Sequence, residues 1–550
     1  MAVGKPDAAV GGPHTTLPVT GRGAGGWAAR AVARMRAMPR SGAWATPLAL
    51  AGALAVITMI PYVYAWTNQP TGRVFMGFFF LADDANTYLA KMREGWEGSW
   101  IWTNRYSTEP GTGAYFFTWW IALGHLAGLL HLNLMLAFHA MRVAGAFALL
   151  GAAWAFIREF VDDPRARKFG IWFLALGLGM GYVVQAIGKP YLFGQQTDTL
   201  DWRMPELSAF YSVLALPHFA WAAAFLAAAC VLTLRAAERG SLRYGLAGGA
   251  AWLGLSSIHA QMPILLGGAF AVALLYRRVS LRGYTATALA FGIALPYVAY
   301  SWWGSSHVPE VVRWSLQWRN NLPPDGLSLS LALAPQLLLA ALGLPGALRR
   351  RSRGDVFLLA WLVLLALILW TPNPAGNLRR RFFDGLYLPL VVLAARGLYE
   401  QLIPRLRGRA IGLVPFAYVS FAAVGSFYLV AAPILFATAP QYSLTTDEVG
   451  ALSWLDSQPR GTVLSSGHFG IYVPAYSSDT AYVGQYSETF NYFAKQREAF
   501  AILNGSESVS QLSDGAHIDY LVWTPDVGAA QPTEGRLVYD TPNAKIYRLT

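Results

Sequence analysis

Charged residues are scarce in this chain of 550 residues. Asp, Glu, Lys and Arg make up only 13% of it, whereas 55% of the residues are hydrophobic, and soluble domains are about 25% charged. A soluble fold could not bury that much apolar surface. Apolar runs of about 15–23 residues alternate with short basic loops, which is the pattern of helices stacked across a membrane. The composition therefore predicts a polytopic α-helical membrane protein.

Cysteine is almost absent, because Cys230 is the only one. A single cysteine excludes a disulfide framework, a CxxC redox motif and a cysteine-based metal site. Rossmann and P-loop patterns are also missing, so no nucleotide cofactor is expected. The net charge of +12 does not indicate a nucleic-acid partner, since the arginines lie between apolar runs and form no continuous basic face.

The basic loops define an expected topology. Residues 1–45 are rich in Gly, Ala, Pro and Arg and contain no apolar run, which predicts a disordered basic cytoplasmic tail. Residues 46–66 are too long for a signal-peptide core and are expected to be an uncleaved first span. Further spans are expected at residues 135–157, 170–188, 213–235, 244–258, 262–276, 284–301, 328–347, 355–371, 385–399 and 410–432. This gives about 11 transmembrane helices in a domain over 46–432, with the N-terminus in the cytoplasm. The Ala- and Arg-rich usage suggests a multi-pass protein of a bacterial plasma membrane.

One apolar run does not fit as a span. If residues 114–130 crossed the membrane, the charged loop at 158–168 and the later arginine clusters would fall outside. We therefore expect this run to be re-entrant or to lie at the membrane surface among the membrane lipids. Residues 67–134 then form one large external loop.

The composition becomes more polar after residue 432, which predicts a small C-terminal extracytoplasmic α/β domain over 433–550. Thr445 and Glu448 form a capping box at the start of a helix. Ser487 is expected to cap a helix over 488–503. Short strands are expected at residues 463–466, 481–485, 519–523, 537–539 and 545–549. No GxSxG or HExxH motif is present here, so this domain is expected to bind or position a ligand rather than to catalyse.

An acidic pair begins a predicted amphipathic helix in the first external loop. Asp83 and Asp84 follow an apolar stretch, and Tyr88, Leu89 and Met92 share one face of the helix. Two adjacent carboxylates at the membrane surface could act as a general base or hold a divalent cation. One of them could equally cap the helix without a chemical role, and the sequence leaves both interpretations open.

Arg379, Arg380 and Arg381 form a cationic cluster in a loop that is expected outside the membrane. Three consecutive arginines there oppose the positive-inside rule, and arginine suits phosphate recognition, with anchoring to lipid headgroups as the alternative. Further candidates for substrate binding are Tyr88 on the predicted helix, Glu109 in a turn, His259 at the outer end of a span, and Arg313 among tryptophans. An ordinary solvated or interfacial role is the alternative for each of them.

This layout, with Asp83 and Asp84 early in a large first external loop, resembles the GT-C superfamily of membrane glycosyltransferases over residues 46–550. The resemblance is to the branch of protein O-mannosyltransferases and lipid A aminoarabinose transferases. It implies a carboxylate near the acceptor, at Asp83 or Asp84, and a polyprenyl-phosphate sugar donor whose phosphate is held by external basic residues, by location the three arginines. The chain lacks a clear HPP-type motif and a recognisable β-trefoil, so a glycan, a lipid or a protein is open as the acceptor.

The resemblance implies a single inverting displacement. Arginine neutralises the phosphate leaving group while a carboxylate removes the proton of the acceptor hydroxyl. No cofactor is required, and a divalent cation at the acidic pair stays an open alternative, although the loop contains no second acidic pair. One rival function is a transporter or flippase of lipid-linked saccharides, which would need ionisable residues in the spans or an inverted repeat. The other is a non-catalytic envelope assembly protein, in which the acidic pair would tolerate substitution.

Overall fold

The computed structural model describes residues 44–192, 194–317, 323–371 and 376–549. The chain divides into two compact units, Met1–Thr46 and Pro47–Thr550. The tail predicted over residues 1–45 lies outside the described residues except for its last two positions. All of the contacts below belong to the second unit.

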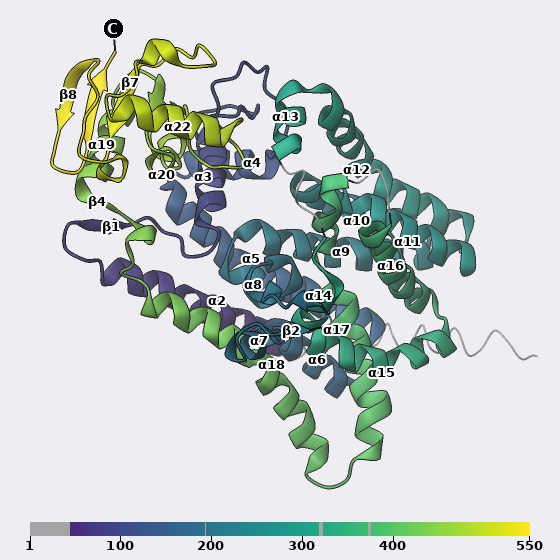
Figure 1. Cartoon of the computed structure of the whole chain (residues 1–550). Helices are drawn as coiled ribbons and strands as arrows, with labels where there is room; N and C mark the ends of the chain where they lie inside the picture. The colour runs from purple at the N-terminus through teal and green to yellow at the C-terminus, as the bar shows by residue number, and fades with distance from the viewer. Residues whose placement is uncertain (1–43, 193, 318–322, 372–375, 550) are drawn as a thin grey trace, which may run out of the picture. The chain divides into compact units, whose positions relative to one another are not determined.

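Apolar helices dominate this unit (Figure 1). Six segments of the described part are long and apolar enough to cross a membrane: α2 (Ala45–Thr67), α5 (Leu134–Phe160), α9 (Pro217–Arg239), α16 (Arg353–Trp370), the continuous helical segment Arg379–Arg405, and α18 (Ala410–Leu435). A seventh arises if α14 (Gly326–Ala332) and α15 (Ala334–Arg350), bent by 88° at their junction, count as one span. The protein is thus a helical membrane protein, while the total of about 11 spans stays a prediction.

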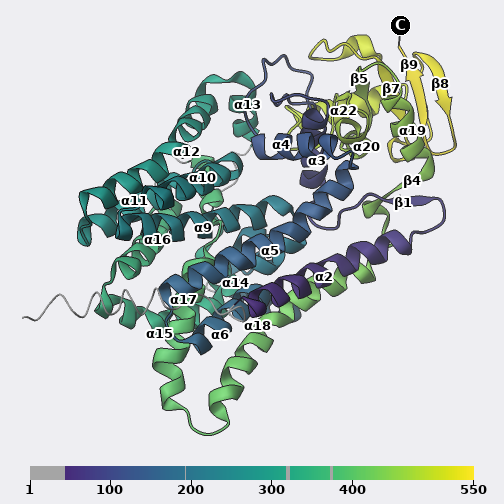
Figure 2. The same cartoon turned by 180° about the vertical axis from the view of Figure 1, so that it is seen from behind.

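Three more helices lie where apolar runs predicted them. These are α10 (Leu242–His259), α11 (Met262–Tyr276) and α12 (Leu281–His307). Figure 2 shows α10, α11, α12 and α16 gathered on one side of the unit, with α2 and α18 on the other.

The run predicted as one span over 170–188 is not one helix. It is divided into α6 (Pro164–Leu176) and α7 (Gly181–Ala186). In the break the backbone bonds to other elements, since the N–H groups of Leu178 and Met180 donate to the carbonyl oxygens of Ala422 and Leu331. Glycine is required there, because a Cβ on Gly179 would lie 2.0 Å from the carbonyl oxygen of Ala332 at the bend between α14 and α15. Sequence periodicity records apolarity but not this close approach, and the expectation of a continuous helix was wrong.

Two short helices occupy the loop between α2 and α5. They are α3 (Ala82–Trp96) and α4 (Thr118–Leu129). Twelve residues of helix extend about 18 Å, which is less than the roughly 30 Å of a bilayer core, so α4 is too short to span, as the loop topology requires. The two helices touch backbone to backbone, because Cβ atoms on Gly95 and Gly124 would lie 2.0 Å and 1.8 Å from main-chain oxygens of the opposite helix.

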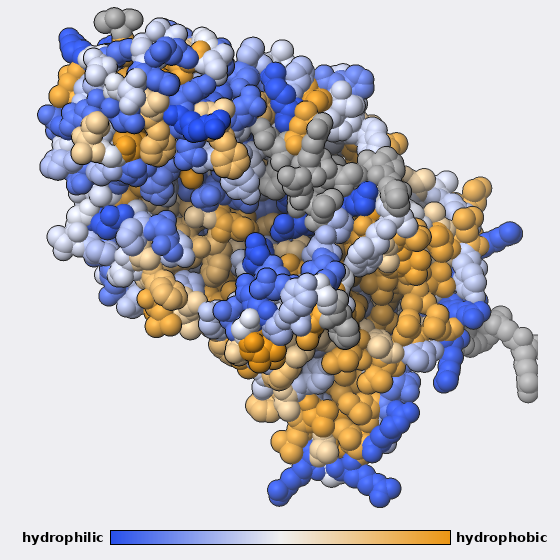
Figure 3. All heavy atoms as spheres, viewed as in Figure 1, coloured by the Kyte–Doolittle hydropathy of each residue, from blue (hydrophilic) through white to orange (hydrophobic). Residues whose placement is uncertain are grey.

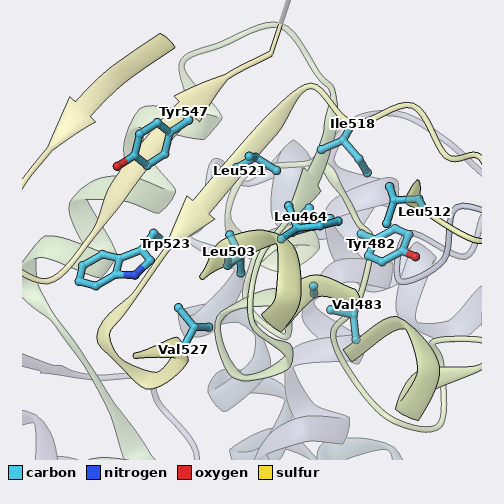
Figure 4. Packing of buried hydrophobic residues seen from close by; sticks show 12 residues of the cluster. Leu464, Tyr482, Val483, Leu503, Leu512, Ile518, Leu521, Trp523, Val527 and Tyr547 are labelled. Carbon is cyan, nitrogen blue, oxygen red and sulfur yellow. The ribbon is translucent and has the colours of Figure 1, made fainter. Parts of the chain in front are cut away.

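The C-terminal region (residues 443–549) contains a five-stranded sheet in the order β6-β5-β7-β9-β8. The strands are β5 (Thr462–Leu464), β6 (Thr480–Ala481), β7 (Tyr520–Trp523), β8 (Arg536–Asp540) and β9 (Lys545–Arg548). β5 pairs in parallel with β6 and β7, and the β7–β9–β8 pairings are antiparallel. Leu464, Leu503 and Leu521 lie in the buried cluster beside the sheet (Figure 4).

The helices of this region match the predictions in part. The capping box of Thr445 and Glu448 is present and begins α19 (Thr446–Asp456). Helix α22 (Tyr492–Leu503) ends at Asn504 as predicted. Its predicted start was wrong, because the left-handed residue Asn491 precedes the helix while the hydroxyl of Ser487 donates to Gln485.

The C-terminal region is fastened to the loop between α2 and α5. Strand β1 (Arg73–Phe75) pairs antiparallel with β4 (Ser443–Thr445). The ammonium of Lys91 on α3 forms a buried 2.8 Å ion pair with Glu488. Figure 3 shows polar residues gathered over the C-terminal region and apolar residues over the helices below it. Helix α3 therefore lies where the polar and the apolar parts of the unit meet.

Candidate functional site

The acidic pair occupies the first turn of α3. The residue that precedes the helix is Leu81, which has a left-handed backbone (φ 50°) and provides no side-chain cap. Neither Asp83 nor Asp84 therefore caps the helix, and that interpretation was wrong. A non-glycine residue with positive φ costs free energy and is concentrated at functional sites, so the bend at Leu81 marks this helix start as a constrained position.

Asp84 is the more enclosed of the two carboxylates. Its Oδ1 accepts a 3.1 Å hydrogen bond from Nε2 of Gln485 in the C-terminal region. Burial raises the pKa of Asp84 to about 6, the positive charge of Arg381 opposes that rise, and the charges of Glu488 and Asp83 add to it. The carboxylate is thus ionised at neutral pH and titrates just below it.

Asp83 is exposed and lies under side chains of the C-terminal region. Partial burial raises its pKa, and the nearby His468 opposes the rise. The hydroxyls of Tyr472 and Tyr492 are also within electrostatic range of this carboxylate. Together with Tyr486, which is within range of both carboxylates, these aromatic side chains of the C-terminal region all interact electrostatically with Asp83, and we call them the aromatic rim.

Arg381 brings the distant basic motif to the acidic pair. It belongs to η4 (Gly376–Phe383), and the charges of Asp84, Glu206 and Asp384 as well as the hydroxyl of Tyr88 all act on its guanidinium. The sequence-predicted acidic and basic motifs, nearly 300 residues apart, therefore lie close enough for the charges of Asp84 and Arg381 to interact.

The other two arginines lie on the same turn. Arg380 is within electrostatic range of Tyr211 and Tyr486. Arg379 is only partly buried, and its Nε atom has no hydrogen-bond partner among the described residues. Neighbouring residues 372–375 of the predicted loop lie outside the described part of the chain.

His259 and Tyr88 support this cluster from two sides. The Nδ1 atom of His259, at the end of α10, contacts Oδ2 of Asp384. Gln261 Nε2, just after α10, donates a 3.3 Å hydrogen bond to the carbonyl oxygen of Arg381. Tyr88 stacks on Trp120 of α4, with ring centroids 4.3 Å apart. The turn after α10 thus holds the arginine segment, and α4 holds Tyr88.

Two of the predicted binding residues have partners elsewhere. The carboxylate of Glu109 forms a 3.0 Å ion pair with the ammonium of Lys495 on α22. Arg313 on α13 (Pro309–Gln317) donates to the carbonyl oxygen of Pro110 at 2.6 Å and lies over the ring of Phe490. Both join the loop after α3 to neighbouring elements, whereas Asp83, Asp84, Tyr88, His259 and Arg381 gather at one site.

Sequence reasoning missed several residues at this site: Lys91, Glu206, His218, His468, Gln485 and Glu488. Those from the C-terminal region reach the acidic pair only through tertiary packing, and no motif marks them. A polar His218 beside Pro217 at the start of an apolar helix was the one local signal available.

A divalent cation at the acidic pair stays an open alternative. Among the described residues, no group of three or more His, Cys, Asp or Glu side chains is arranged to hold a metal ion. One or two carboxylates, completed by water and substrate phosphate, are however the usual protein ligands of Mg²⁺. The chemistry proposed below assigns no step to a metal.

Comparisons with known proteins were made at the level of sequence and of structure. No protein-family model matches the sequence, and no curated protein matches it.

Solved structures with a similar fold are membrane glycosyltransferases. The oligosaccharyltransferase of Archaeoglobus fulgidus in its apo form is 14% identical with a TM-score of 0.53, over 87% of this chain and 70% of that one. The oligosaccharyltransferase AglB from Archaeoglobus fulgidus, in complex with an inhibitory peptide and a dolichol-phosphate, is 14% identical with a TM-score of 0.51, over 86% of this chain and 69% of that one. The mycobacterial arabinofuranosyltransferase AftD is 14% identical with a TM-score of 0.50, over 90% of this chain and 40% of that one. The chain therefore shares the fold of these glycosyltransferases.

Proposed function

We propose that the protein is an integral-membrane glycosyltransferase that moves a sugar from a polyprenyl-phosphate donor to an extracytoplasmic acceptor by a single inverting displacement. The observation that carries the proposal is the electrostatic interaction of Arg381 with Asp84 across nearly 300 residues of sequence. A phosphate-binding cation and a candidate base are the two groups that this reaction needs side by side. The dolichol-phosphate complex of the archaeal enzyme supports a lipid-phosphate donor.

Each step can be assigned to groups of this chain. The acceptor oxygen attacks the anomeric carbon from the face opposite the phosphate, its proton passes to a carboxylate, and the bond between that carbon and the phosphate oxygen breaks. The leaving lipid phosphate gains a negative charge. Arg381, whose charge interacts with that of Asp84, stabilises that charge in the transition state more than in the ground state.

The two carboxylates take different parts in this scheme. Asp83 is exposed to an incoming acceptor and is proposed as the base. Asp84, bonded to Gln485 and beside Arg381, is proposed to orient the arginine and the C-terminal region. The division explains why two adjacent carboxylates are needed although only one proton moves.

The aromatic rim is proposed as the acceptor entrance. His468, Tyr472, Tyr486 and Tyr492 surround Asp83 from the C-terminal region. Tyrosine combines an apolar ring with a hydroxyl, which suits the apolar faces and the hydroxyl groups of a saccharide. A glycan acceptor is therefore favoured over a lipid chain, which would need a wholly apolar entrance.

The test is sugar transfer by the purified protein in liposomes supplied with radiolabelled polyprenyl-phosphate sugars and envelope glycans. Asp83→Asn should abolish transfer, whereas Asp540→Asn, an exposed aspartate on β8, should leave it unchanged. Retained folding is checked by thermal unfolding in detergent.

Two outcomes would overturn the proposal. If no donor in a broad panel is turned over by the wild-type protein while labelled lipid crosses the bilayer intact, transport is the better account. If donors are turned over equally well by the wild type and by both Asp83→Asn and Asp84→Asn, the acidic pair is not the reaction centre.

A further inference from the structure

His218 is a buried imidazole without a protein partner. It is the second residue of α9 and is only 2% exposed. Neither Nδ1 nor Nε2 has a hydrogen-bond partner among the described residues. Buried polar side chains are nearly always hydrogen-bonded, and leaving one unpaired is costly. An imidazole with both nitrogens unpaired therefore points to a partner that is not part of the chain.

Aromatic rings fix the position of this imidazole. The ring of His218 lies 4.8 Å from the ring of Tyr88, 5.3 Å from that of Trp120 and 4.0 Å from that of Phe219, measured between centroids. His259 follows at 5.8 Å. Tyr88 interacts with the guanidinium of Arg381, and His259 contacts Asp384, so His218 lies beside residues of the candidate site.

The electrostatic surroundings favour an anion as the missing partner. The charges of Arg381 and Lys91 both reach the imidazole of His218. A neutral imidazole offers one N–H donor. One N–H group within the field of a guanidinium and an ammonium matches an oxyanion with several acceptor oxygens, such as a phosphate.

We infer that His218 binds the phosphate of the lipid-linked donor by donating its N–H to a non-bridging oxygen. This inference rests on the proposed function. The phosphate carries one negative charge as a diester and a second develops as the bond to the sugar breaks. The hydrogen bond from His218 therefore strengthens along the reaction, and it holds the released lipid phosphate more tightly than the donor.

The test measures lipid-phosphate binding apart from sugar transfer. Radiolabelled undecaprenyl phosphate is titrated onto the full chain in nanodiscs. His218→Phe keeps a ring against Tyr88 and Trp120 but removes both nitrogens. It should weaken binding roughly 10- to 100-fold, the loss expected for one hydrogen bond to a charged group. His218→Gln, which restores an N–H donor, should recover part of it.

His307→Phe is the matched control. His307 is exposed and stacks on Trp303, so its replacement changes a histidine without touching the site. Inorganic phosphate, added as a competitor, should displace the lipid only at millimolar concentration, because it lacks the polyprenyl chain. Should His218→Phe fail to fold, His218→Met removes the nitrogens in a more adaptable side chain.

Normal lipid-phosphate binding by a folded His218→Phe protein would overturn the inference and would mean that buried water satisfies the imidazole. Competition by inorganic phosphate as strong as by the lipid phosphate would also overturn it, by identifying a site for free phosphate. Wild-type sugar transfer tests the proposed function separately, so the two failures can be told apart.

Discussion

Replacing Gly124 by alanine should impair the proposed sugar transfer without unfolding the protein. A Cβ at this position would lie 1.8 Å from the carbonyl oxygen of Met92 on α3, whereas real Cβ contacts stay above 3.0 Å. The two helices would have to separate by at least about 1.2 Å, since both atoms belong to rigid backbone. A displacement of about 1 Å in a reacting group can cost 100-fold in rate, so kcat/KM should fall about 100-fold.

The assay is sugar transfer in liposomes, accompanied by thermal unfolding in detergent. Gly95→Ala, whose Cβ would lie 2.0 Å from the oxygen of Ile121, should have the same effect from the opposite helix. Gly151→Ala on α5 is the control, because nothing lies within 4 Å of its Cβ, and it should keep full activity. Full activity in Gly124→Ala would refute the argument that α3 is positioned by its contact with α4.

Three further predictions concern charge. Burial raises the pKa of Asp84 to about 6, and Asp84 must be ionised to orient Arg381. Transfer should therefore fall about tenfold for each pH unit below 6. A profile that is flat down to pH 4.5 would contradict this. Arg381→Ala should raise the KM for the donor at least tenfold, whereas the exposed Arg409→Ala should not, and equal KM values would exclude phosphate binding. Lys91→Met leaves Glu488 buried and unpaired and should destabilise the protein by about 3–5 kcal/mol, with Lys91→Met/Glu488→Leu recovering part of it in thermal melts.

The sequence located the helices well but not their interruptions. Apolar runs gave α2, α5, α9, α11 and α18 to within a few residues, because hydrophobicity over about 20 residues depends on local composition alone. The break between α6 and α7 depends on the approach of Gly179 to Ala332, a residue about 150 positions away. No local pattern encodes such a contact.

The candidate site was predictable in part for the same reason. Asp83, Asp84 and the arginines stood out because their charges oppose their apolar or topological surroundings, a signal that a single sequence contains. Gln485 and His468 stood out in no way, since they are ordinary polar residues of a polar region. Their importance comes from the docking of the C-terminal region on α3.

The hydrogen bond between Gln485 and Asp84 joins residues 401 positions apart. Since a ribosome adds about 5–20 residues per second, Gln485 is synthesised about 20–80 s after Asp84. The acidic pair is thus synthesised early, and its hydrogen bond to Gln485 can form only when the chain is nearly complete. An unfinished or truncated chain would carry the acidic pair and the arginines yet lack the aromatic rim that is proposed as the acceptor entrance. Dependence on the last hundred residues ties activity to completed synthesis.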